Sequence, residues 1–485
     1  MKSSARSAPI LYGKNESCAM AEHEHQDPVC EYEREPVPPS ALLGLKNYVG
    51  QFAGEHVAGT ELMIGPLFLA AGVSAFDLLV GLLVGNLLAV LSWTFFTAPI
   101  ATRVRLTLYY QLEKICGRKL VTLYNVANGV MFTFLAGAMI TVSATALGVW
   151  FKFPMPGLGD LLPNSLGWVT AVLVMGVLFT MVAAYGYKIV SAFANIAAPW
   201  MVLVFVAFGV IGLRQLGLTS LGDFWHVAQT VIWKGGAPMT GQIKFTFWHV
   251  MFFAWFCNMA WHIGMADLTL FRYARHSWYG VASTAGMFVG HFMAWIAASI
   301  LYAVQLHQDP GNTAVLPGPL AYRACGVAGL LCVVAAGWTT ANPTLYRAGL
   351  AFQSLVPTSS RFRVTMLTGL VATVTAVFPL VTMKLLDFVA LWGMILMPMG
   401  AVIFVDFWLL ERWGLRRNYA EAVGCGFNWA AGVTWFLTMA ICFWLVLRGG
   451  VQIYFVSLPG WFIAAILYVV LSRALQRRVP AGSVA

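Results

Sequence analysis

Two short polar segments interrupt very apolar stretches of this chain and hold its most reactive side chains. The first spans residues 54–61 (Gly-Glu-His-Val-Ala-Gly-Thr-Glu) and the second spans residues 261–267 (Trp-His-Ile-Gly-Met-Ala-Asp). In each segment a histidine precedes an acid by five positions, with a glycine between them. Ionisable groups are costly at bilayer depth, and glycine-interrupted membrane helices are typical of sites where a solute or ion binds. The pattern therefore indicates a transporter.

The first segment places Glu55, His56 and Glu61 within one expected membrane span. In a continuous helix, residues five apart differ by roughly 140° of rotation, so these groups would face different directions. Unwinding at the glycines would let them share one cavity. The alternative is that Glu55 or Glu61 pairs with a basic residue of a neighbouring span. Both acids are also candidate proton carriers, because burial favours the protonated form of a carboxylate.

The second segment lies in an expected span that contains Trp255, Asn258, His262 and Asp267. Asn258 and His262 are four residues apart, which predicts that they share a helix face and offer hydrogen bonds to a polar solute. Asp267 lies near Arg272 and has either a binding role or a structural one. Most of the tryptophans are expected at the membrane interface or in the core.

A third segment, residues 335–343 (Ala-Ala-Gly-Trp-Thr-Thr-Ala-Asn-Pro), interrupts another apolar run. Pro343 has no N–H, so the carbonyl of Thr339 loses its partner within the helix. A free carbonyl beside the hydroxyls of Thr339 and Thr340 would suit a hard monovalent cation. The alternative is a proline kink in which the hydroxyls bond to carbonyls of their own helix. Asn128 and its polar neighbours predict that the span over 120–148 is also buried beside the cavity.

The elements that position these groups are expected to be membrane helices. The sequence of 485 residues is 60% hydrophobic and only 10% charged, whereas soluble domains are about 25% charged. Apolar runs long enough to cross a bilayer predict an all-α protein with about twelve spans. The spans are expected at 48–72, 76–101, 120–148, 166–186, 189–213, 246–271, 278–304, 324–355, 364–383, 386–410, 428–447 and 452–472.

The distribution of positive charge predicts the orientation. With the N-terminus inside, about 22 of the 29 Lys and Arg residues fall in inside segments, which is the bias expected of a multi-pass membrane protein. Both termini are therefore expected in the cytoplasm, in a plasma or inner membrane. Residues 1–44 are expected to form a polar cytoplasmic tail. The net charge of +10 follows from this bias, so nucleic acid is not an expected partner.

Several motifs, in order, resemble the nucleobase:cation symporter family of purine, cytosine and allantoin permeases. Residues 72–74 (Gly-Val-Ser) are similar to its Gly-Leu-Ser, and residues 267–269 (Asp-Leu-Thr) to its Asp-Phe-Thr. Residues 338–340 (Trp-Thr-Thr) and 345–351 (Leu-Tyr-Arg-Ala-Gly-Leu-Ala) resemble its Trp-Thr-Thr and Leu-Tyr-Ser-Ala-Gly-Leu-Ala. Pro398 and Gly400, followed by Asp-Phe-Trp-Leu at 406–409, resemble the end of its tenth span.

The resemblance implies a five-plus-five inverted-repeat core over 45–411, with repeats at about 45–213 and 245–411, and two peripheral helices in 412–485. Spans 1, 3, 6 and 8 would line the substrate site. Family members stack the base between tryptophans of spans 3 and 6, but Asn258 occupies that span 6 position here. Phe132 or Phe134, together with Trp255 or Trp261, would replace this pair, and Thr344 stands where an asparagine typically binds the base.

The chain is thus expected to be a symporter that imports a nucleobase-like solute with sodium or protons, rather than an enzyme. The rivals are a carrier of amino acids or other small polar solutes, and a membrane receptor or integral membrane enzyme. The predicted substrate-binding residues are Glu55, His56, Asn128, Phe132, Trp255, Asn258, His262 and Thr344. The resemblance implies cation ligands at Ala53, His56, Ala336, Thr339 and Thr340. No cofactor is expected besides the coupling cation, and the predicted partners are the small solute and the lipid bilayer.

Overall fold

The computed structural model describes residues 31–157, 159–380 and 385–476, and its regular elements there are helices. The first predicted repeat contains η2 (Pro39–Ala41), α2 (Leu45–His56), α3 (Glu61–Ala70), α4 (Ala75–Ser92), η3 (Trp93–Thr97), α5 (Ala98–Val104), α6 (Leu108–Cys116), α7 (Arg118–Phe151), α8 (Leu166–Ala184) and α9 (Tyr187–Gln215). A connecting region follows with η4 (Leu221–Asp223), α10 (Phe224–Val227) and η5 (Ala228–Ile232).

The second predicted repeat contains α11 (Phe247–Phe256), α12 (Leu268–Phe271), η6 (Ser277–Ala282), η7 (Ala285–Phe292), α13 (Met293–Gln308), α14 (Pro317–Leu355), α15 (Arg361–Ala376) and α17 (Leu385–Trp408). The remaining elements are η8 (Glu411–Trp413), α18 (Tyr419–Val423), α19 (Trp429–Leu447) and α20 (Ile453–Leu475). The expectation of an all-α fold is confirmed.

The predicted spans correspond to these helices. Nine continuous helical stretches in the described part of the chain are long and apolar enough to cross a membrane. Predicted spans 1 and 6 are not among them because each is broken into two shorter helices, α2 with α3 and α11 with α12. Predicted span 9 corresponds to α15, and its last predicted residues, 381–383, lie outside the described residues. The protein is therefore a multi-pass membrane protein.

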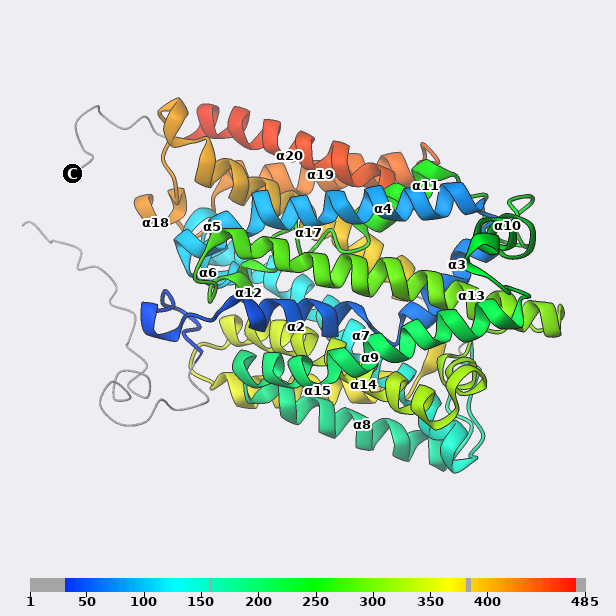
Figure 1. Ribbon diagram of the computed structural model, residues 1–485. Coiled ribbons are helices and arrows are strands. Elements are labelled where there is room, and N and C mark those ends of the chain that lie inside the picture. The colour runs from blue at the N-terminus through cyan, green and yellow to red at the C-terminus, as the bar shows by residue number, and fades with distance from the viewer. Residues whose placement is uncertain (1–30, 158, 381–384, 477–485) are drawn as a thin grey trace, which may run out of the picture.

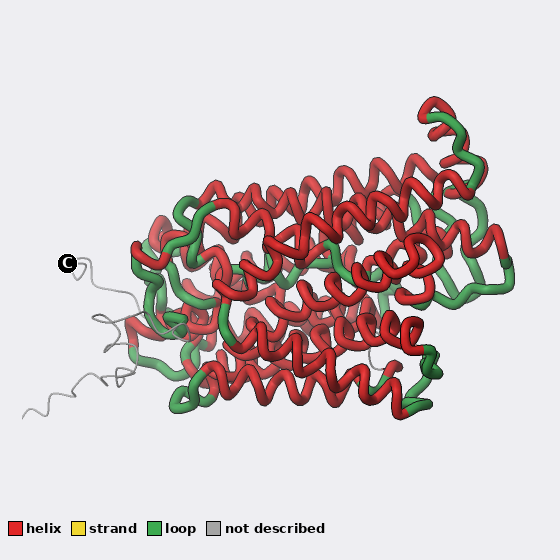
Figure 2. The backbone as a smooth tube through the Cα atoms, turned by 60° about the horizontal axis from the view of Figure 1, so that its bottom comes forward, coloured by secondary structure: helices red, strands yellow, loops and turns green. Residues whose placement is uncertain are grey.

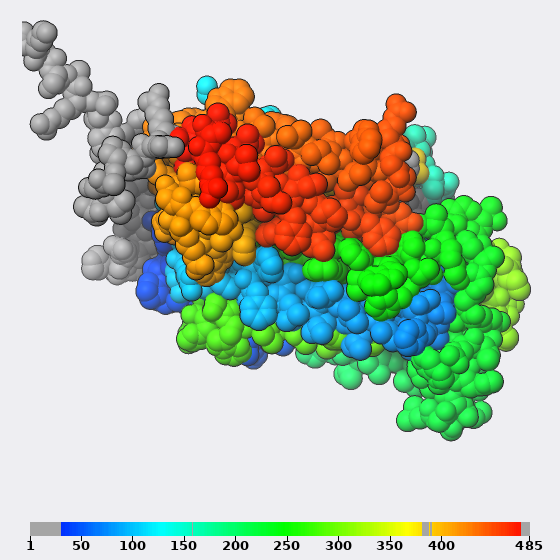
Figure 3. Space-filling view, turned by 90° about the horizontal axis from the view of Figure 1, so that it is seen from above, coloured from blue at the N-terminus to red at the C-terminus, as the bar shows by residue number. Residues whose placement is uncertain are grey.

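The helices run side by side along one direction, with loops gathered at the two ends of the bundle (Figures 1 and 2). One end carries α5, α6, α12 and α18, and we call it the α18 end; the other carries α3 and α10, and we call it the α10 end (Figure 1). The Lys- and Arg-rich segments that were expected inside the cell, such as Arg103 to Lys119, lie at the α18 end. Helices α19 and α20 cover one face of the bundle beside α17 (Figure 3).

The two broken helices leave the helical path in different ways. The first break is short, from Val57 to Thr60, and α3 begins at Glu61. The second break is longer and runs over residues 257–267, where Met265 adopts a left-handed conformation with φ 63°. Helix α17 packs tightly against this second break: a Cβ on Gly400 would clash with the carbonyl oxygen of Ile263. By contrast, α14 stays helical through Pro343, and its only non-helical residue is Gly326.

Residues 31–44 of the expected polar tail lie against the α18 end at some positions. Glu31 is only 5% exposed and Val37 only 1%, whereas Glu35, Pro36, Pro39 and Ser40 are exposed. The backbone N–H of Val37 donates to the carbonyl of Arg105 at 3.1 Å. The cytoplasmic location of the tail stays a prediction. Residues 1–30 lie outside the described part.

Candidate functional site

A cavity of about 100 Å³ lies where the two broken helices meet. A water molecule needs roughly 10–15 Å³ measured in this way, so the cavity has room for several waters or for a small solute. Its walls come from α2, α3, α7, the second break, η7, α13 and α14, with α11, α17 and α20 completing it. The lining residues are Glu55, His56, Ala58, Thr60, Glu61, Ile64, Leu135, Met139, Phe253, Phe256, Cys257, Asn258, Met259, Trp261, His291, Trp295, Thr340, Thr344, Ala390 and Tyr454.

Glu55, His56 and Glu61 all line this cavity, as expected if span 1 unwinds between them. The break at Val57–Thr60 reorients the chain, so that the end of α2 and the start of α3 face the same space. Each of the three side chains is at most 5% exposed. The Nδ1 atom of His56 lies 3.0 Å from the carbonyl oxygen of Phe52, so it donates there and leaves Nε2 as an acceptor.

Glu55 is held in a buried ion-pair network. Arg347, on α14, donates from Nη1 to Oε1 of Glu55 at 2.6 Å and from Nη2 to Oε2 at 3.2 Å. The same Nη2 donates to Oδ1 of Asp267 at 2.6 Å. Trp261 and Gln51 also donate to the Glu55 carboxylate, each at 3.2 Å. The alternative in which Glu55 pairs with a basic residue of a neighbouring span is therefore the one observed.

Asp267 has a different partner from the one considered in the sequence. Trp93 donates to its Oδ2 at 2.7 Å, and Arg347 occupies its Oδ1. Arg272 instead contacts the tail: its Nη2 donates to the carbonyl of Glu31 at 2.7 Å. Asp267, at the end of the second break, is thus bonded to η3 and α14 rather than to Arg272.

Glu61 occupies a different environment from that of Glu55. Trp295 donates from Nε1 to its Oε2, and Nε2 of His291 lies 4.0 Å from its Oε1. Within the described ranges, no Lys or Arg forms an ion pair with Glu61. The His291 ring stacks on Trp295, with ring centroids 4.2 Å apart, and approaches the ring of His56 at 4.9 Å.

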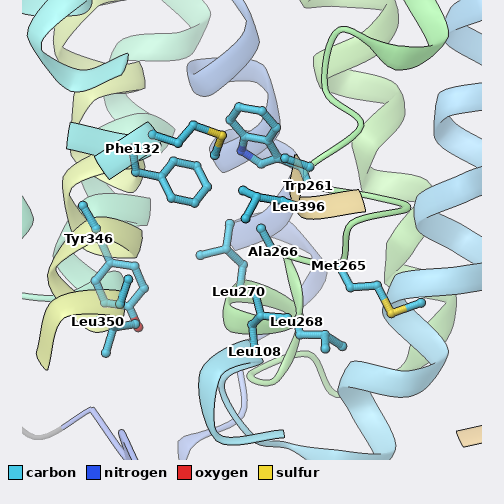
Figure 4. Packing of buried hydrophobic residues seen from close by; sticks show 14 of the residues in the cluster. Leu108, Phe132, Trp261, Met265, Ala266, Leu268, Leu270, Tyr346, Leu350 and Leu396 are labelled. Atoms are coloured by element: carbon cyan, nitrogen blue, oxygen red, sulfur yellow. The ribbon is translucent and has the colours of Figure 1, made fainter. Parts of the chain in front are cut away.

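The aromatic residues near the cavity divide into two groups. Phe132 on α7 and Trp261 face each other edge to face, with ring centroids 5.4 Å apart (Figure 4). Only Trp261 of this pair lines the cavity, and Phe132 supports it from behind. Trp255 does not line the cavity, because its Nε1 donates to Ser92 at 3.0 Å and its ring stacks on Phe256.

Asn258 and His262 do not share a helix face, so that prediction is wrong. Helix α11 ends at Phe256, and both residues lie in the irregular break. Asn258 lines the cavity, with its Nδ2 3.5 Å from Nε2 of His291. His262 turns away and bonds to the carbonyl of Trp255 at 2.9 Å. Residues i and i+4 share a face only within a continuous helix, and α11 ends two residues before Asn258.

Oxygen atoms converge where α14 passes the first break. The Thr340 hydroxyl lies 2.8 Å from the carbonyl of Glu55 and 3.0 Å from that of Ala336. The Thr339 hydroxyl lies 3.2 Å from the Ala336 carbonyl and 3.7 Å from the sulfur of Met201. The Ala53 carbonyl accepts the Val57 N–H at 3.0 Å. Each hydroxyl therefore bonds to the protein here, and the alternative of local threonine bonding is realised.

Two further predicted residues are placed by the structure. Thr344 lines the cavity and donates its hydroxyl to the carbonyl of Thr340 at 2.6 Å. Asn128, on α7, is fully buried but does not line the cavity, and its amide has no hydrogen-bond partner among the described residues. His291 on η7 also lines the cavity, although nothing in the sequence spacing around it points there.

A second cluster of charged residues lies at the α18 end of the bundle. Tyr273 and Tyr346 donate to Oε2 of Glu31 at 2.6 and 2.8 Å, and Arg272 lies 3.8 Å from the same oxygen. Arg361 approaches Glu33 at 3.9 Å, but burial dominates there and raises the pKa of Glu33.

Comparison with known proteins supports the fold. No protein-family model matches this sequence, and no curated protein sequence matches it. Among solved structures, Mhp1, a nucleobase-cation-symport-1 family transporter in a closed conformation with bromovinylhydantoin bound, matches with a TM-score of 0.69. The alignment has 15% identity and covers 93% of this chain and 97% of that one.

Two further solved structures are similar to this chain. A Na⁺-coupled sialic acid symporter matches with a TM-score of 0.65 and 14% identity over 90% of this chain and 91% of that one. MhsT in complex with L-phenylalanine matches with a TM-score of 0.55 and 14% identity, covering 88% and 97%. The resemblance found in the sequence is thus confirmed at the level of the fold.

Proposed function

We propose that this protein is a secondary active symporter that moves a small planar polar solute of the nucleobase class through the cavity by alternating access. The observation that supports the proposal is the cavity at the two helix breaks, where non-helical backbone and polar side chains converge inside a membrane protein. Backbone that has lost its helical bonds at bilayer depth is expected only where it lines a cavity or is buried in protein.

The chemistry of the cavity wall favours an uncharged or cationic solute. Asn258, Thr340 and Thr344 supply amide and hydroxyl groups, and Trp261 supplies an aromatic edge. Of the described residues that line the cavity, none is Lys or Arg, and the two acids are Glu55 and Glu61. An anionic solute would therefore meet no compensating positive charge from a lining side chain. Nucleobases are planar and neutral and can use all of these contacts.

The coupling ion is part of the same proposal. For sodium, the ligands would be the carbonyls of Glu55 and Ala336 with the hydroxyls of Thr339 and Thr340, which would turn their hydrogens away from the ion. The proposed orientation places the α18 end in the cytoplasm of a plasma or inner membrane, because the Lys- and Arg-rich segments gather there. The solute would then enter from the α10 end.

A second candidate function is transport of an organic amine on the same fold. It is favoured by Glu61, a cavity carboxylate that no described Lys or Arg neutralises. A cationic amine would be attracted to that carboxylate, whereas a neutral base would not depend on it. A receptor or membrane enzyme remains the rival from another class, and neither would accumulate a solute against its gradient.

The test is uptake into proteoliposomes that contain the full chain. Labelled uracil, cytosine, hypoxanthine and allantoin, with a set of amines and amino acids, are compared under separate sodium and proton gradients. We expect saturable uptake of a nucleobase, strongly reduced by Asn258→Ala and unchanged by Asn164→Ala, a matched control in an exposed loop. Uptake of amines alone would favour the second candidate, and no uptake of any solute by folded protein would refute the transport proposal.

A further inference from the structure

The two cavity acids differ in whether they are free to change charge. Glu55 receives two hydrogen bonds from Arg347 and one each from Gln51 and Trp261, so its carboxylate is saturated by donors. A carboxylate that accepts several donors, one of them a guanidinium, is strongly held in its ionised form. Protonating it would also leave Arg347 with only Asp267 to balance it. These contacts therefore stabilise the ionised form of Glu55.

Glu61 has the opposite surroundings. It is 3% exposed, and among the described residues the indole of Trp295 is its one hydrogen-bond donor. Apolar side chains such as Ile64 and Phe253 form the nearby wall. An isolated ionised carboxylate is very costly to bury, and the inexpensive way to neutralise it is to bind a proton. Its position as the first residue of α3 gives the ionised form partial support from the helix N-terminus, so both charge states are accessible there.

His291 provides a neighbouring site for the same proton. Its Nε2 lies 4.0 Å from Oε1 of Glu61, and its Nδ1 lies 3.8 Å from the sulfur of Cys257. Histidine exchanges protons near neutral pH more readily than any other side chain. A proton can therefore reside on either group, with the pair changing between a neutral acid beside a neutral imidazole and an ion pair.

The backbone around His291 has an unusual conformation that places this residue next to the first break. The segment Ala285–Phe292 is a π-helix, a rare form that is frequent at functional sites. Two glycines of this segment allow the close approach: a Cβ on Gly290 would lie 2.5 Å from the carbonyl oxygen of His56, and one on Gly286 would lie 2.7 Å from its Nδ1. No larger residue fits at these positions without moving span 1. This packing does not involve the Glu61 carboxylate, and it holds the helix that carries His291 against the end of α2.

We propose that Glu61 and His291 form the proton-binding site of this transporter, and that the proton they bind moves with the solute while Glu55 remains a fixed charge. The proton is taken up from the side of the α10 end onto the Glu61 carboxylate, exchanges with Nε2 of His291, and is released when the cavity opens at the other end. No other group is oxidised, reduced or transferred. The inference rests on the proposed symport and names its coupling site.

The titratable groups that face Glu61 come from several elements. They are Glu55 and His56 on α2, Cys257 in the second break, His291 on η7 and Tyr454 on α20. Glu55 forms an ion pair with Arg347, and Nδ1 of His56 donates its hydrogen to the Phe52 carbonyl. Cys257 and Tyr454 are weaker acids than a carboxyl group. The Glu61–His291 pair is therefore the part of the cavity that can gain and lose a proton most easily.

The first measurement does not depend on knowing the solute. Infrared difference spectra of the full chain in lipid are recorded between about pH 8.5 and about pH 5.5, above the range where exposed Asp and Glu titrate. We expect the carbonyl stretch of a protonated carboxylic acid in the wild type and in Glu421→Gln, an exposed control at the α18 end. The band should be weaker in Glu61→Gln by the contribution of one carboxyl group, whereas other carboxyls with a raised pKa, such as Glu33, keep their own contribution. If the band has the same intensity in Glu61→Gln as in the wild type, the assignment of the site is overturned.

The second measurement links the site to transport. A difference of one pH unit can concentrate a solute about tenfold when one proton is coupled. Glu61→Gln should lose this accumulation while retaining solute exchange across the membrane, because exchange needs binding and alternating access but no net proton movement. Loss of exchange as well would mean that Glu61 binds the solute itself, as an amine carrier requires, and would overturn the proton assignment. Wild-type protein that moves no solute would refute the proposed function and leave the infrared result to decide the proton site.

Discussion

Replacement of Arg347 by alanine is expected to destabilise the protein more than removal of any exposed arginine. Arg347 is fully buried and holds two carboxylates, Glu55 and Asp267, which come from the two broken spans. Alanine at this position would leave both acids buried without a counter-charge. The matched control is Arg412→Ala, which removes an exposed arginine at the α18 end.

The magnitude follows from the geometry of the network. At an effective dielectric constant of about 20, unit charges 2.6 Å apart attract by roughly 6 kcal/mol, and the structure has two such contacts. Desolvation of the three groups offsets most of this attraction, so the net contribution of the intact network is small. Removal of one partner is different, because the desolvation cost of the others remains, and such losses are about 3–5 kcal/mol.

A neutralised network should recover this loss. In the triple variant Arg347→Met, Glu55→Gln and Asp267→Asn, the side chains keep similar volumes but carry no charge. Replacement of a buried ion pair by uncharged groups of similar volume is often neutral for stability. We therefore expect the triple variant to be at least about 2 kcal/mol more stable than Arg347→Ala, since most of the loss of about 3–5 kcal/mol disappears.

The assay is reversible unfolding of the purified chain in mixed micelles of increasing denaturing-detergent content, followed by tryptophan fluorescence. The free energy of unfolding is compared for the wild type, Arg347→Ala, the triple variant and Arg412→Ala. Equal stability of Arg347→Ala and the wild type would refute the network as a buried ion pair. A triple variant as unstable as Arg347→Ala would show that packing, rather than unpaired charge, accounts for the loss.

Three further outcomes are expected. If the oxygens beside α14 bind sodium, Thr339→Ala with Thr340→Ala should abolish stimulation of uptake by sodium and leave proton-driven uptake intact, measured in proteoliposomes under each gradient separately. Phe132→Ala should lower the free energy of unfolding by at least about 1 kcal/mol, because it removes the edge-to-face contact with Trp261 and leaves a cavity behind it, measured by the same unfolding in detergent. Gly290→Ala should lower both stability and uptake, because its Cβ would lie 2.5 Å from the carbonyl of His56; normal activity would contradict the close packing of η7.

Local sequence signals predicted most of the fold. Apolar runs located the spans, and Gly59 with its polar neighbours located the break in span 1, because both signals depend on residues close together in the chain. The polar segment at 261–267 predicted an interruption in span 6, but it did not predict the length of the second break. Its irregular path from Cys257 to Asp267 depends on contacts with distant elements, such as the packing of Gly400 against Ile263, and no local propensity encodes them.

The site was predicted less completely than the fold. Glu55, His56, Asn258 and Thr344 line the cavity as expected, because polar groups in apolar spans have few other reasons to be there. Trp255 and His262 do not line it, since their orientations follow from the exact residue at which α11 ends. Helix ends are the least predictable boundary in a sequence, and a shift of one residue rotates a side chain by about 100°.

The two acids of span 1 illustrate the limit of sequence reasoning most clearly. Glu55 and Glu61 are six residues apart, in the same span, and are equally plausible proton carriers when only neighbouring residues are considered. Their difference is created by partners far away in the chain: Arg347 is 292 residues from Glu55, and Trp295 is 234 residues from Glu61. A guanidinium fixes the charge of one acid, and an indole leaves the charge of the other free to change. The fold therefore assigns separate tasks, a fixed charge and a mobile proton, to two identical side chains.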